Sequence, residues 1–300
     1  MSQGMKVRLA TSAAIVLSDL SRLERLLWPG INAVEIGAVA GPKVIGLVAR
    51  TLRVKGLGLG LHSPVVAGGV KLLKPGDGGL SDSVLAQIRG ELALAQSVSA
   101  DYLLLHYPWF EASPPTQEVA GWITLATRQL ESLMESPANQ SGESSGESAG
   151  PGGGVPLIFE MKLGRSRHPG IIASLINGGP VALGLGGSRL CLDVGDWLLA
   201  CEELGVDPVA AFQPLASLVS VLHVHAVERH PGGRYNYVWK PIHPEDPDAE
   251  AVLALCHLAV EHGTTKTIVF EHTPHLDPGV EYDLQGFAWL RGELDGDYRE

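Results

Sequence analysis

Eight short apolar runs recur along this 300-residue chain, and they constrain its fold more than any other feature of the sequence. Each run is largely apolar throughout rather than alternating, which is typical of strands covered on both faces of a parallel sheet. The runs cover residues 7–11, 33–37, 56–62, 101–107, 156–162, 189–195, 219–227 and 266–273. The chain is therefore expected to be an α/β protein with many buried strands.

Helical patterns lie between several of these runs, so strand and helix alternate. The patterns cover residues 17–27, 81–97, 119–134, 197–203 and 248–262. Eight strands in this order predict a (β/α)₈ TIM barrel that spans residues 1–300 as a single domain. A doubly wound open sheet is the alternative, but it would not need eight strands.

One segment departs from this rhythm. Residues 135–154 are rich in Ser, Gly and Glu and have no apolar periodicity. Such a composition cannot bury enough surface to offset the entropy of ordering. We expect a disordered insert before the fifth strand, and a surface loop is favoured over a partner-binding segment because surface loops lengthen at little cost.

From the third strand onward, six strands end in a residue type that binds metal ions. These residues are His62, His106, Glu160, Asp193, His223 and Glu271. The carboxyl ends of the strands of a parallel barrel meet at one rim, where the active sites of such barrels lie. This convergence makes the chain an enzyme candidate.

The bulk composition limits the partners. The net charge of −11 and the pI near 5.4 repel a phosphate backbone, so nucleic acid is an unfavourable partner. No apolar run approaches the ~18 residues of a membrane span. The first apolar stretch imitates a signal peptide, but Ser18 and Asp19 soon interrupt it, and a first barrel strand is the favoured interpretation.

The three cysteines, Cys191, Cys201 and Cys256, form no CxxC pair, and their odd count argues against a disulfide framework. They are expected to be buried apolar fillers in a protein of a reducing compartment. A cytoplasmic location is therefore predicted.

Glu160 and Glu271 lie in the apolar runs IFEM and IVFEH, where an unpaired carboxylate would carry a large desolvation penalty. Each therefore needs a cation or a proton. For Glu160 the simplest alternative is a salt bridge to Lys162 or Arg165. Asp193 and His223 complete a set that suits a divalent ion, either Mg²⁺ or Mn²⁺ with carboxylates, or Mn²⁺, Co²⁺ or Zn²⁺ with a mixed oxygen and imidazole shell.

The order of Glu160, Asp193, His223 and Glu271 on strands five to eight resembles the xylose isomerase-like barrel superfamily. That superfamily includes sugar isomerases and epimerases and the type IV apurinic endonucleases. In the epimerase branch, the resemblance implies that these four residues hold one metal ion and that Glu160 and Glu271 exchange protons at the carbon next to a carbonyl. Physical chemistry agrees, because a metal polarises the carbonyl and acidifies the neighbouring C–H.

The endonuclease branch implies a second metal ion held by His62, His106 and Glu160, and thus a zinc-dependent phosphodiester hydrolase. Histidines at these two positions also resemble substrate contacts of sugar-active members. The sequence departs from the endonuclease pattern at Asp196, where a histidine is expected. It also lacks a downstream Asp-x-His pair, since the loop with His243 offers none.

Further candidate substrate contacts are Asp196, His225, Arg234, Lys240, His243 and Trp109. The charged residues among them lie mostly in the loop after strand seven, where the superfamily often places substrate contacts and where solvated charges are the simplest alternative. His225 points to the same side of its strand as His223, as a partner of the metal ligands or as a packed barrel residue. Trp109, Phe110 and Trp239 could stack on a sugar or simply pack.

Other catalytic motifs are missing. No GxSxG is present, and the glycines at 56–60 do not complete GxGxxG because residue 61 is Leu, so no nucleotide cofactor is expected. The favoured prediction is a divalent-metal-dependent isomerase or epimerase of a sugar or a sugar-like hydroxy-carbonyl compound. The phosphodiester hydrolase and a non-catalytic metal-binding barrel stay open as alternatives, as does a homo-oligomeric state.

Overall fold

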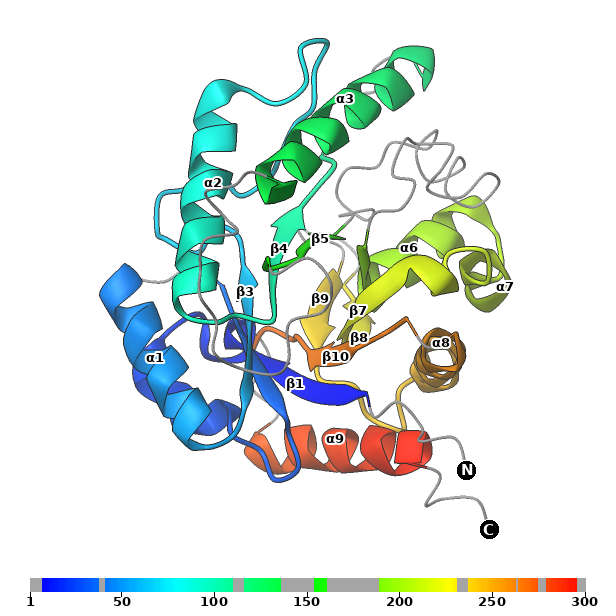
Figure 1. The fold of residues 1–300 in the computed structure, drawn as a ribbon. Helices are drawn as coiled ribbons and strands as arrows, with labels where there is room; N and C mark the ends of the chain where they lie inside the picture. Colours follow the sequence, from blue (N-terminus) through cyan, green and yellow to red (C-terminus); the bar gives the residue numbers. More distant parts are fainter. Residues whose placement is uncertain are drawn as a thin grey trace, which may run out of the picture.

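The computed structural model describes residues 7–37, 41–109, 116–135, 154–160, 189–230, 237–262, 264–274 and 279–295. Eight parallel strands form a closed barrel in the order β1-β10-β7-β6-β5-β4-β3-β2 (Figure 1). They are β1 (Arg8–Ser12), β2 (Ala33–Ile36), β3 (Gly58–His62), β4 (Tyr102–His106), β5 (Leu157–Glu160), β6 (Leu190–Asp193), β7 (Val219–Val224) and β10 (Thr267–Phe270). The predicted TIM barrel is confirmed, and every predicted strand overlaps one of these.

The apolar runs fill two layers of core. Inward side chains such as Leu104, Ile158, Val221 and Val269 pack inside the barrel, together with Cys191. The side chains between them point outward and pack against the surrounding helices. Both faces of each strand are therefore apolar, which explains why the runs do not alternate.

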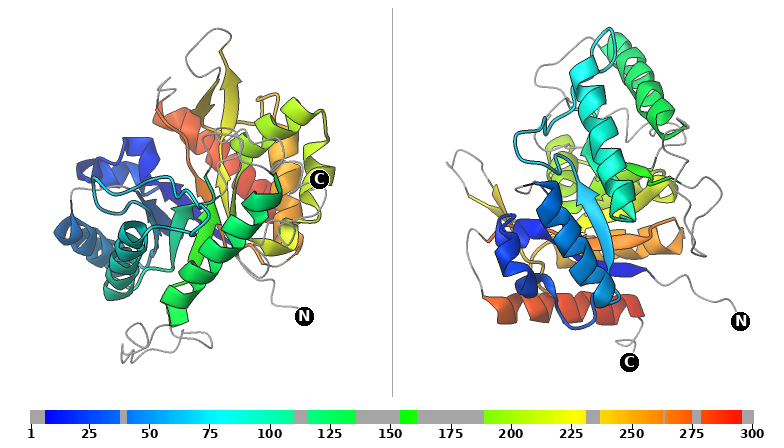
Figure 2. Two further views of the ribbon diagram at one scale, coloured as in Figure 1. Left: turned by 90° about the horizontal axis from the view of Figure 1, so that it is seen from above. Right: turned by 60° about the vertical axis from the view of Figure 1, so that its left-hand side comes forward.

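The helices surround the barrel (Figures 1 and 2). They are α1 (Pro42–Val54), α2 (Asp82–Ser97), α3 (Thr116–Glu135), α6 (Val194–Leu204), α7 (Pro208–Phe212), α8 (Ala249–Glu261) and α9 (Val280–Asp295). The sequence patterns predicted α2, α3, α6 and α8. They missed α1, α7 and α9.

The predicted helix at residues 17–27 is wrong in kind. The segment contains the 3₁₀ helix η2 (Leu20–Leu26), and another 3₁₀ helix, η1 (Ala13–Val16), ends just before it. A further one, η4 (Ala216–Leu218), precedes β7. Leu17 and Ser18 have φ angles of 52° and 60°, so the chain turns through the left-handed region between η1 and η2. Leucines at helical spacing predicted a continuous helix, but the backbone breaks between them.

The strand predicted over 219–227 is correct only as far as Val224. Beyond it the chain leaves the barrel and forms an antiparallel hairpin of β8 (Ala226–Arg229) and β9 (Tyr237–Lys240). This hairpin projects from the barrel in both views of Figure 2. The apolar run continues across the boundary because both strands carry buried residues, so hydropathy alone could not mark the change.

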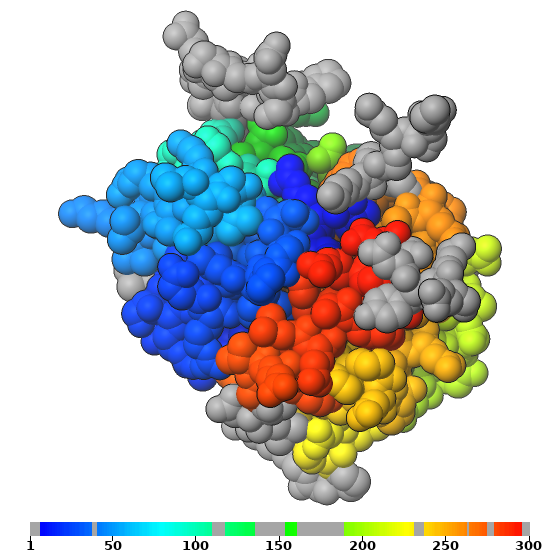
Figure 3. Space-filling view, turned by 90° about the horizontal axis from the view of Figure 1, so that it is seen from below, coloured from blue at the N-terminus to red at the C-terminus, as the bar shows by residue number. Residues whose placement is uncertain are grey.

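Helix α9 fastens the end of the described chain to its beginning. Figure 3 shows it in red between the blue amino-terminal residues and the gold and orange segment that contains α8. Phe287 meets the ring of Trp28 edge to face with centroids 5.5 Å apart, and Arg291 donates a hydrogen bond to the carbonyl of Pro29. Gly286 allows the helix to lie directly against the backbone of Ile242.

Three further expectations concern the chain as a whole. The cysteines are free and buried, as predicted. Among the described residues, no helix combines the length and the apolar character that crossing a membrane requires. The insert predicted at 135–154 falls almost entirely on residues outside the described ranges and stays a prediction, as does the cytoplasmic location.

Candidate metal-binding active site

Three carboxylates converge at the carboxyl ends of the strands. Glu160 ends β5, Asp193 ends β6 and Glu271 directly follows β10. One oxygen of each lies within 4.8 Å of the others. Glu160 and Asp193 are buried, and 17% of the Glu271 side chain is exposed, so the cluster is accessible from the Glu271 side. Three like charges so close together favour a bound cation.

His223, near the end of β7, brings an imidazole nitrogen to this cluster. Its Nδ1 atom lies 2.5 Å from Oε2 of Glu271 and 3.7 Å from Oε2 of Glu160. The side chain is fully buried. Sequence analysis proposed these four residues as one ligand set, and the fold brings their donor atoms into one region.

A second group lies on the other side of Glu160. The Nε2 atoms of His62 and His106, at the ends of β3 and β4, lie 3.0 Å and 3.1 Å from the same Oε2 atom of Glu160. Nδ1 of His62 donates to the backbone carbonyl of Ser63, which leaves Nε2 to face the carboxylate. Potential ligand atoms of His62, His106 and Glu160 also lie within 4.8 Å of one another.

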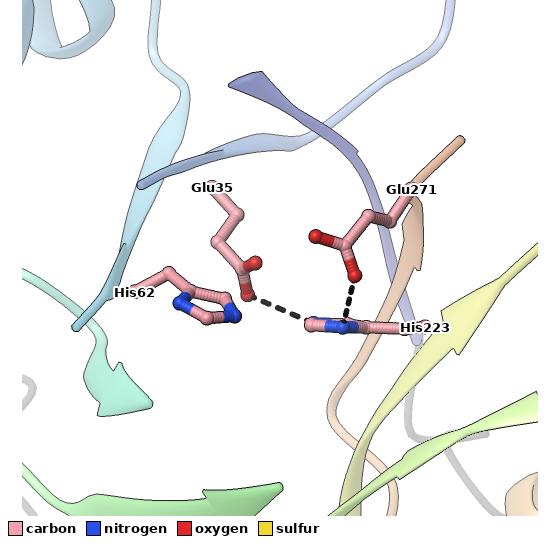
Figure 4. A group of neighbouring side chains, drawn as sticks. All are labelled: Glu35, His62, His223 and Glu271. Atoms are coloured by element: carbon pink, nitrogen blue, oxygen red, sulfur yellow. Dashed lines mark hydrogen bonds and ion pairs between the residues drawn. The ribbon is translucent and has the colours of Figure 1, made fainter. Parts of the chain in front are cut away.

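Glu35, which was not among the predicted site residues, points into the same region from β2. Its Oε2 atom lies 3.2 Å from Nε2 of His223 and accepts a hydrogen bond from the hydroxyl of Tyr102 at 2.8 Å. Figure 4 shows Glu35 and Glu271 approaching the His223 ring from two sides, with His62 opposite. The signal was present in the sequence, since a carboxylate inside the apolar run AVEIG raises the same desolvation argument as Glu160. Glu35 is not the last residue of its strand, however, and a search of strand ends passes over it.

His225 holds Asp193 in place. Its Nε2 atom lies 2.9 Å from Oδ1 of Asp193, and its Nδ1 donates to the backbone carbonyl of Glu271 at 2.6 Å. The ring stacks on Trp239 with centroids 4.3 Å apart. The same Asp193 oxygen accepts the backbone N–H of Asp196 and so caps α6.

The carboxylates set the charge of the neighbouring imidazoles. Burial alone would lower the pKa of His62, but Glu160, Glu35 and Glu271 outweigh it and raise the pKa. Burial would lower the pKa of His223, but Cys191 and the carboxylates of Glu271, Glu35 and Glu160 around the ring raise it well above its ordinary value. The pKa of His225 is raised against the effect of burial by Asp193. In the metal-free protein, the acidic surroundings therefore favour the protonated form of these imidazoles.

The remaining predicted substrate contacts that the structure describes have partners of their own. The amine of Lys240 pairs with Asp246, whose other oxygen accepts the backbone N–H of His243 at 2.7 Å. The ring of His243 stacks on Tyr282. Trp109 is buried and donates its backbone N–H to Leu73. Their roles stay predictions. Arg234, Phe110, Lys162 and Arg165 lie outside the described residues.

A separate cavity of about 460 Å³ lies at the opposite, amino-terminal end of the barrel. Arg8, Arg53, Gly58 and Asp101 contribute to its lining, and Arg8 pairs with Asp101 at 2.8 Å. It contains none of the convergent imidazoles and carboxylates. Because the chemistry of such barrels takes place at the carboxyl ends of the strands, the acidic cluster and not this cavity is the candidate active site.

No protein-family model and no curated protein matches the sequence. Solved structures do match the fold over nearly the full length of both chains. A zinc-bound IolI protein matches with a TM-score of 0.64 at 14% identity, covering 97% of this chain and 99% of that one. The chain shares the fold of the xylose isomerase-like barrels.

Two further matches have names that describe an activity. A D-tagatose 3-epimerase-like protein matches with a TM-score of 0.61 at 14% identity over 96% of this chain and 97% of that chain. The 3-keto-D-glucoside 4-epimerase of E. coli matches with a TM-score of 0.59 at 14% identity over 95% and 99%. At this identity the likeness establishes the fold, and the function has to be argued from the site.

The donor set fits a divalent metal ion. Hard carboxylate oxygens suit Mg²⁺ and Mn²⁺, and an added imidazole extends the range to Co²⁺ and Zn²⁺. Asp193 and His223 are each held by a further partner, Asp193 by His225 and His223 by Glu35. Such outer partners are a regular feature of protein metal sites.

Proposed function

We propose that this protein is a divalent-metal-dependent isomerase or epimerase that acts on a sugar or a similar hydroxy-carbonyl compound. The convergence of Glu160, Asp193 and Glu271 within 4.8 Å, with Nδ1 of His223 beside Glu271, carries the proposal. The epimerases that share this fold support a sugar-like substrate. The zinc bound to the IolI protein supports a divalent ion.

When bound, the metal ion would polarise the substrate carbonyl and lower the pKa of the adjacent C–H. Glu160 and Glu271 then act as an acid/base pair. One carboxylate removes the proton from the carbon next to the carbonyl, and the other, in its protonated form, returns a proton to the opposite face of that carbon or to the neighbouring atom. One proton is removed and one is returned, so the reaction needs no redox cofactor.

The other residues at the rim hold this pair and the substrate. His225 and the backbone N–H of Asp196 fix the carboxylate of Asp193. His62 and His106 lie on the far side of Glu160, where their ring nitrogens can meet substrate oxygens. Trp239, stacked on His225, offers an aromatic surface that is half-buried.

Solvent exchange tests the proposal most directly. The protein loaded with Mn²⁺, Co²⁺, Zn²⁺ or Mg²⁺ is incubated with a panel of ketoses in D₂O, and NMR follows deuterium entering the carbon next to the carbonyl. Glu160→Gln and Glu271→Gln should each reduce exchange by roughly 10²-fold or more, because general acid–base groups contribute on that scale. Glu118→Gln, an exposed change on α3, is the matched control. Exchange retained in both site variants would refute the acid/base roles.

The cluster of His62, His106 and Glu160 favours a second candidate, a dinuclear hydrolase of phosphodiesters. The metal content of the purified protein separates the two. One equivalent that is unchanged in His106→Ala supports the isomerase, whereas two or more zinc ions that fall by one in this variant support hydrolysis. Elemental mass spectrometry provides the count.

A further inference from the structure

The carboxylate of Glu35, on β2, is fully buried and is not one of the three converging carboxylates. Its Oε2 atom lies 3.2 Å from Nε2 of His223 and 2.8 Å from the hydroxyl of Tyr102. Nothing in the proposed proton transfer uses it. Burying a carboxylate is costly unless it is paired, so its contact with the metal-ligand candidate His223 calls for an explanation.

The two nitrogens of His223 face different surroundings. Nδ1 faces Oε2 of Glu271 at 2.5 Å and Oε2 of Glu160 at 3.7 Å, which both belong to the proposed metal centre. Nε2 faces Glu35, whose second contact is a hydroxyl rather than another carboxylate. Figure 4 shows Glu271 at one ring nitrogen of His223 and Glu35 at the other. A cation at Nδ1 and a proton at Nε2 fit these surroundings.

We propose that Glu35 is a positioning residue for the metal centre: it accepts the Nε2 proton of His223 and so presents Nδ1 to the metal ion. The inference rests on the metal centre of the proposed function and assigns a residue that the proton-transfer chemistry leaves out. A carboxylate behind a ligating histidine fixes the tautomer and the orientation of the ring and makes it a better donor.

The register of the barrel explains how Glu35 is held. Glu35 on β2 pairs with Gly60 on β3, and Gly60 pairs with Tyr102 on β4. A Cβ atom at Gly60 would lie 2.4 Å from the hydroxyl oxygen of Tyr102. Tyr102 can therefore cross over Gly60 and donate to Glu35 only because residue 60 has no side chain. Burial raises the pKa of Tyr102 well above its usual range, so its hydroxyl stays a donor.

A competing arrangement has to be separated from this one. Potential ligand atoms of Glu35, His62, His223 and Glu271 also lie within 4.8 Å of one another. A metal ion bound by Glu35 itself would take Nε2 of His223 and leave the proton on Nδ1. The two arrangements differ in which ring nitrogen carries the proton.

The first experiment measures Co²⁺ affinity by visible absorption and by competition with a chelating dye, with no substrate present. Glu35→Gln keeps the shape but loses the charge and should weaken Co²⁺ binding by roughly 10- to 100-fold, the usual cost of losing such a partner. The Co²⁺ affinity of Tyr102→Phe should lie between those of the wild type and Glu35→Gln. Glu202→Gln is the control, because the carboxylate of Glu202 pairs with Arg229 at an exposed position.

The second experiment records the ¹H–¹⁵N correlations of the His223 ring in the zinc-loaded protein. A proton on Nε2 supports the inference, and a proton on Nδ1 overturns it. Wild-type Co²⁺ affinity in Glu35→Gln also overturns it, even where Glu160→Gln has lost turnover. A third outcome separates the two proposals: Glu35→Gln binds Co²⁺ more weakly, but the wild type exchanges no proton of any ketose. That result would support the role of Glu35 and would refute only the proposed function.

Discussion

His225 joins Asp193 to Glu271 through one ring: its Nε2 atom lies 2.9 Å from the Asp193 carboxylate, and its Nδ1 donates to the Glu271 backbone carbonyl at 2.6 Å. Two ligand candidates from strands β6 and β10 are thus held by a residue that follows β7. His225 therefore orients the candidate metal ligands, although it is not one of the proposed ligands itself.

Removing this ring should loosen the metal site. We expect His225→Ala to weaken Co²⁺ or Zn²⁺ binding by roughly 10-fold or more, because Asp193 loses the partner that orients it. Isothermal titration calorimetry measures the affinity. His257→Ala on α8 is the control, and equal affinities in the two variants would contradict the role of His225.

Metal binding should depend on pH. The pKa values of His62 and His223 are raised in the metal-free protein, which favours protonated rings. A metal ion at His223, or at both residues in the dinuclear case, has to displace such protons. Affinity should therefore increase as pH rises above the usual histidine value of about 6.5. Titrations at pH 6, 7 and 8 in buffers of different ionisation enthalpy report both the affinity and the protons released. A pH-independent affinity without proton release would rule out this exchange.

The metal-free protein should show the opposite trend in stability. A histidine whose pKa is higher in the folded than in the unfolded state stabilises the fold fully below about pH 6.5, and this contribution is lost as pH rises through the folded value. His62, His223 and His225 all act in this direction. The melting temperature of chelator-treated protein should therefore fall as pH rises above 6.5. A melting temperature that rises over this range would show that other groups dominate.

Packing of α9 provides a test of the fold that is independent of the site. A Cβ atom at Gly286 would lie 1.8 Å from the backbone carbonyl oxygen of Ile242, which is an immovable neighbour. Gly286→Ala should lower the free energy of unfolding by about 1–3 kcal/mol or more. Gly90→Ala, inside α2 with open space around it, should instead raise that free energy by about 0.4–1 kcal/mol. Chemical denaturation of both variants measures the difference.

The sequence predicted the barrel because each strand carries its own signal. The positions of the strands along the chain and the convergence of Glu160, Asp193, His223 and Glu271 follow from apolar runs that carry ligand types near their ends. Helix α1 could also have been found, since Ile45, Val48, Ala49 and Leu52 are buried at helical spacing. Helix α9 is harder to recognise, because many of its positions are polar or aromatic and its contacts with Trp28 and Pro29 lie far away in the chain.

The missed parts of the site depend on contacts between strands. Nothing local to Glu35 indicates that it meets His223, 188 residues further along the chain. The hairpin of β8 and β9, which brings Trp239 over His225, is hidden in the same way. Only the closure of the barrel and the register of its strands bring these residues together. Neither could be predicted from this sequence alone, so these contacts could not be predicted either.

Because Glu35, Gly60 and Tyr102 lie in one row across β2, β3 and β4, both halves of the chain contribute to the metal centre. Strands β2 to β4 supply the support behind His223, and strands β5 to β10 supply the carboxylates it faces. Two fragments divided between β4 and β5 would separate the four ligand candidates from the support that Glu35 gives to His223. Tight metal binding would then return only when both halves close into one barrel, so a bound ion would serve as a spectroscopic reporter of assembly.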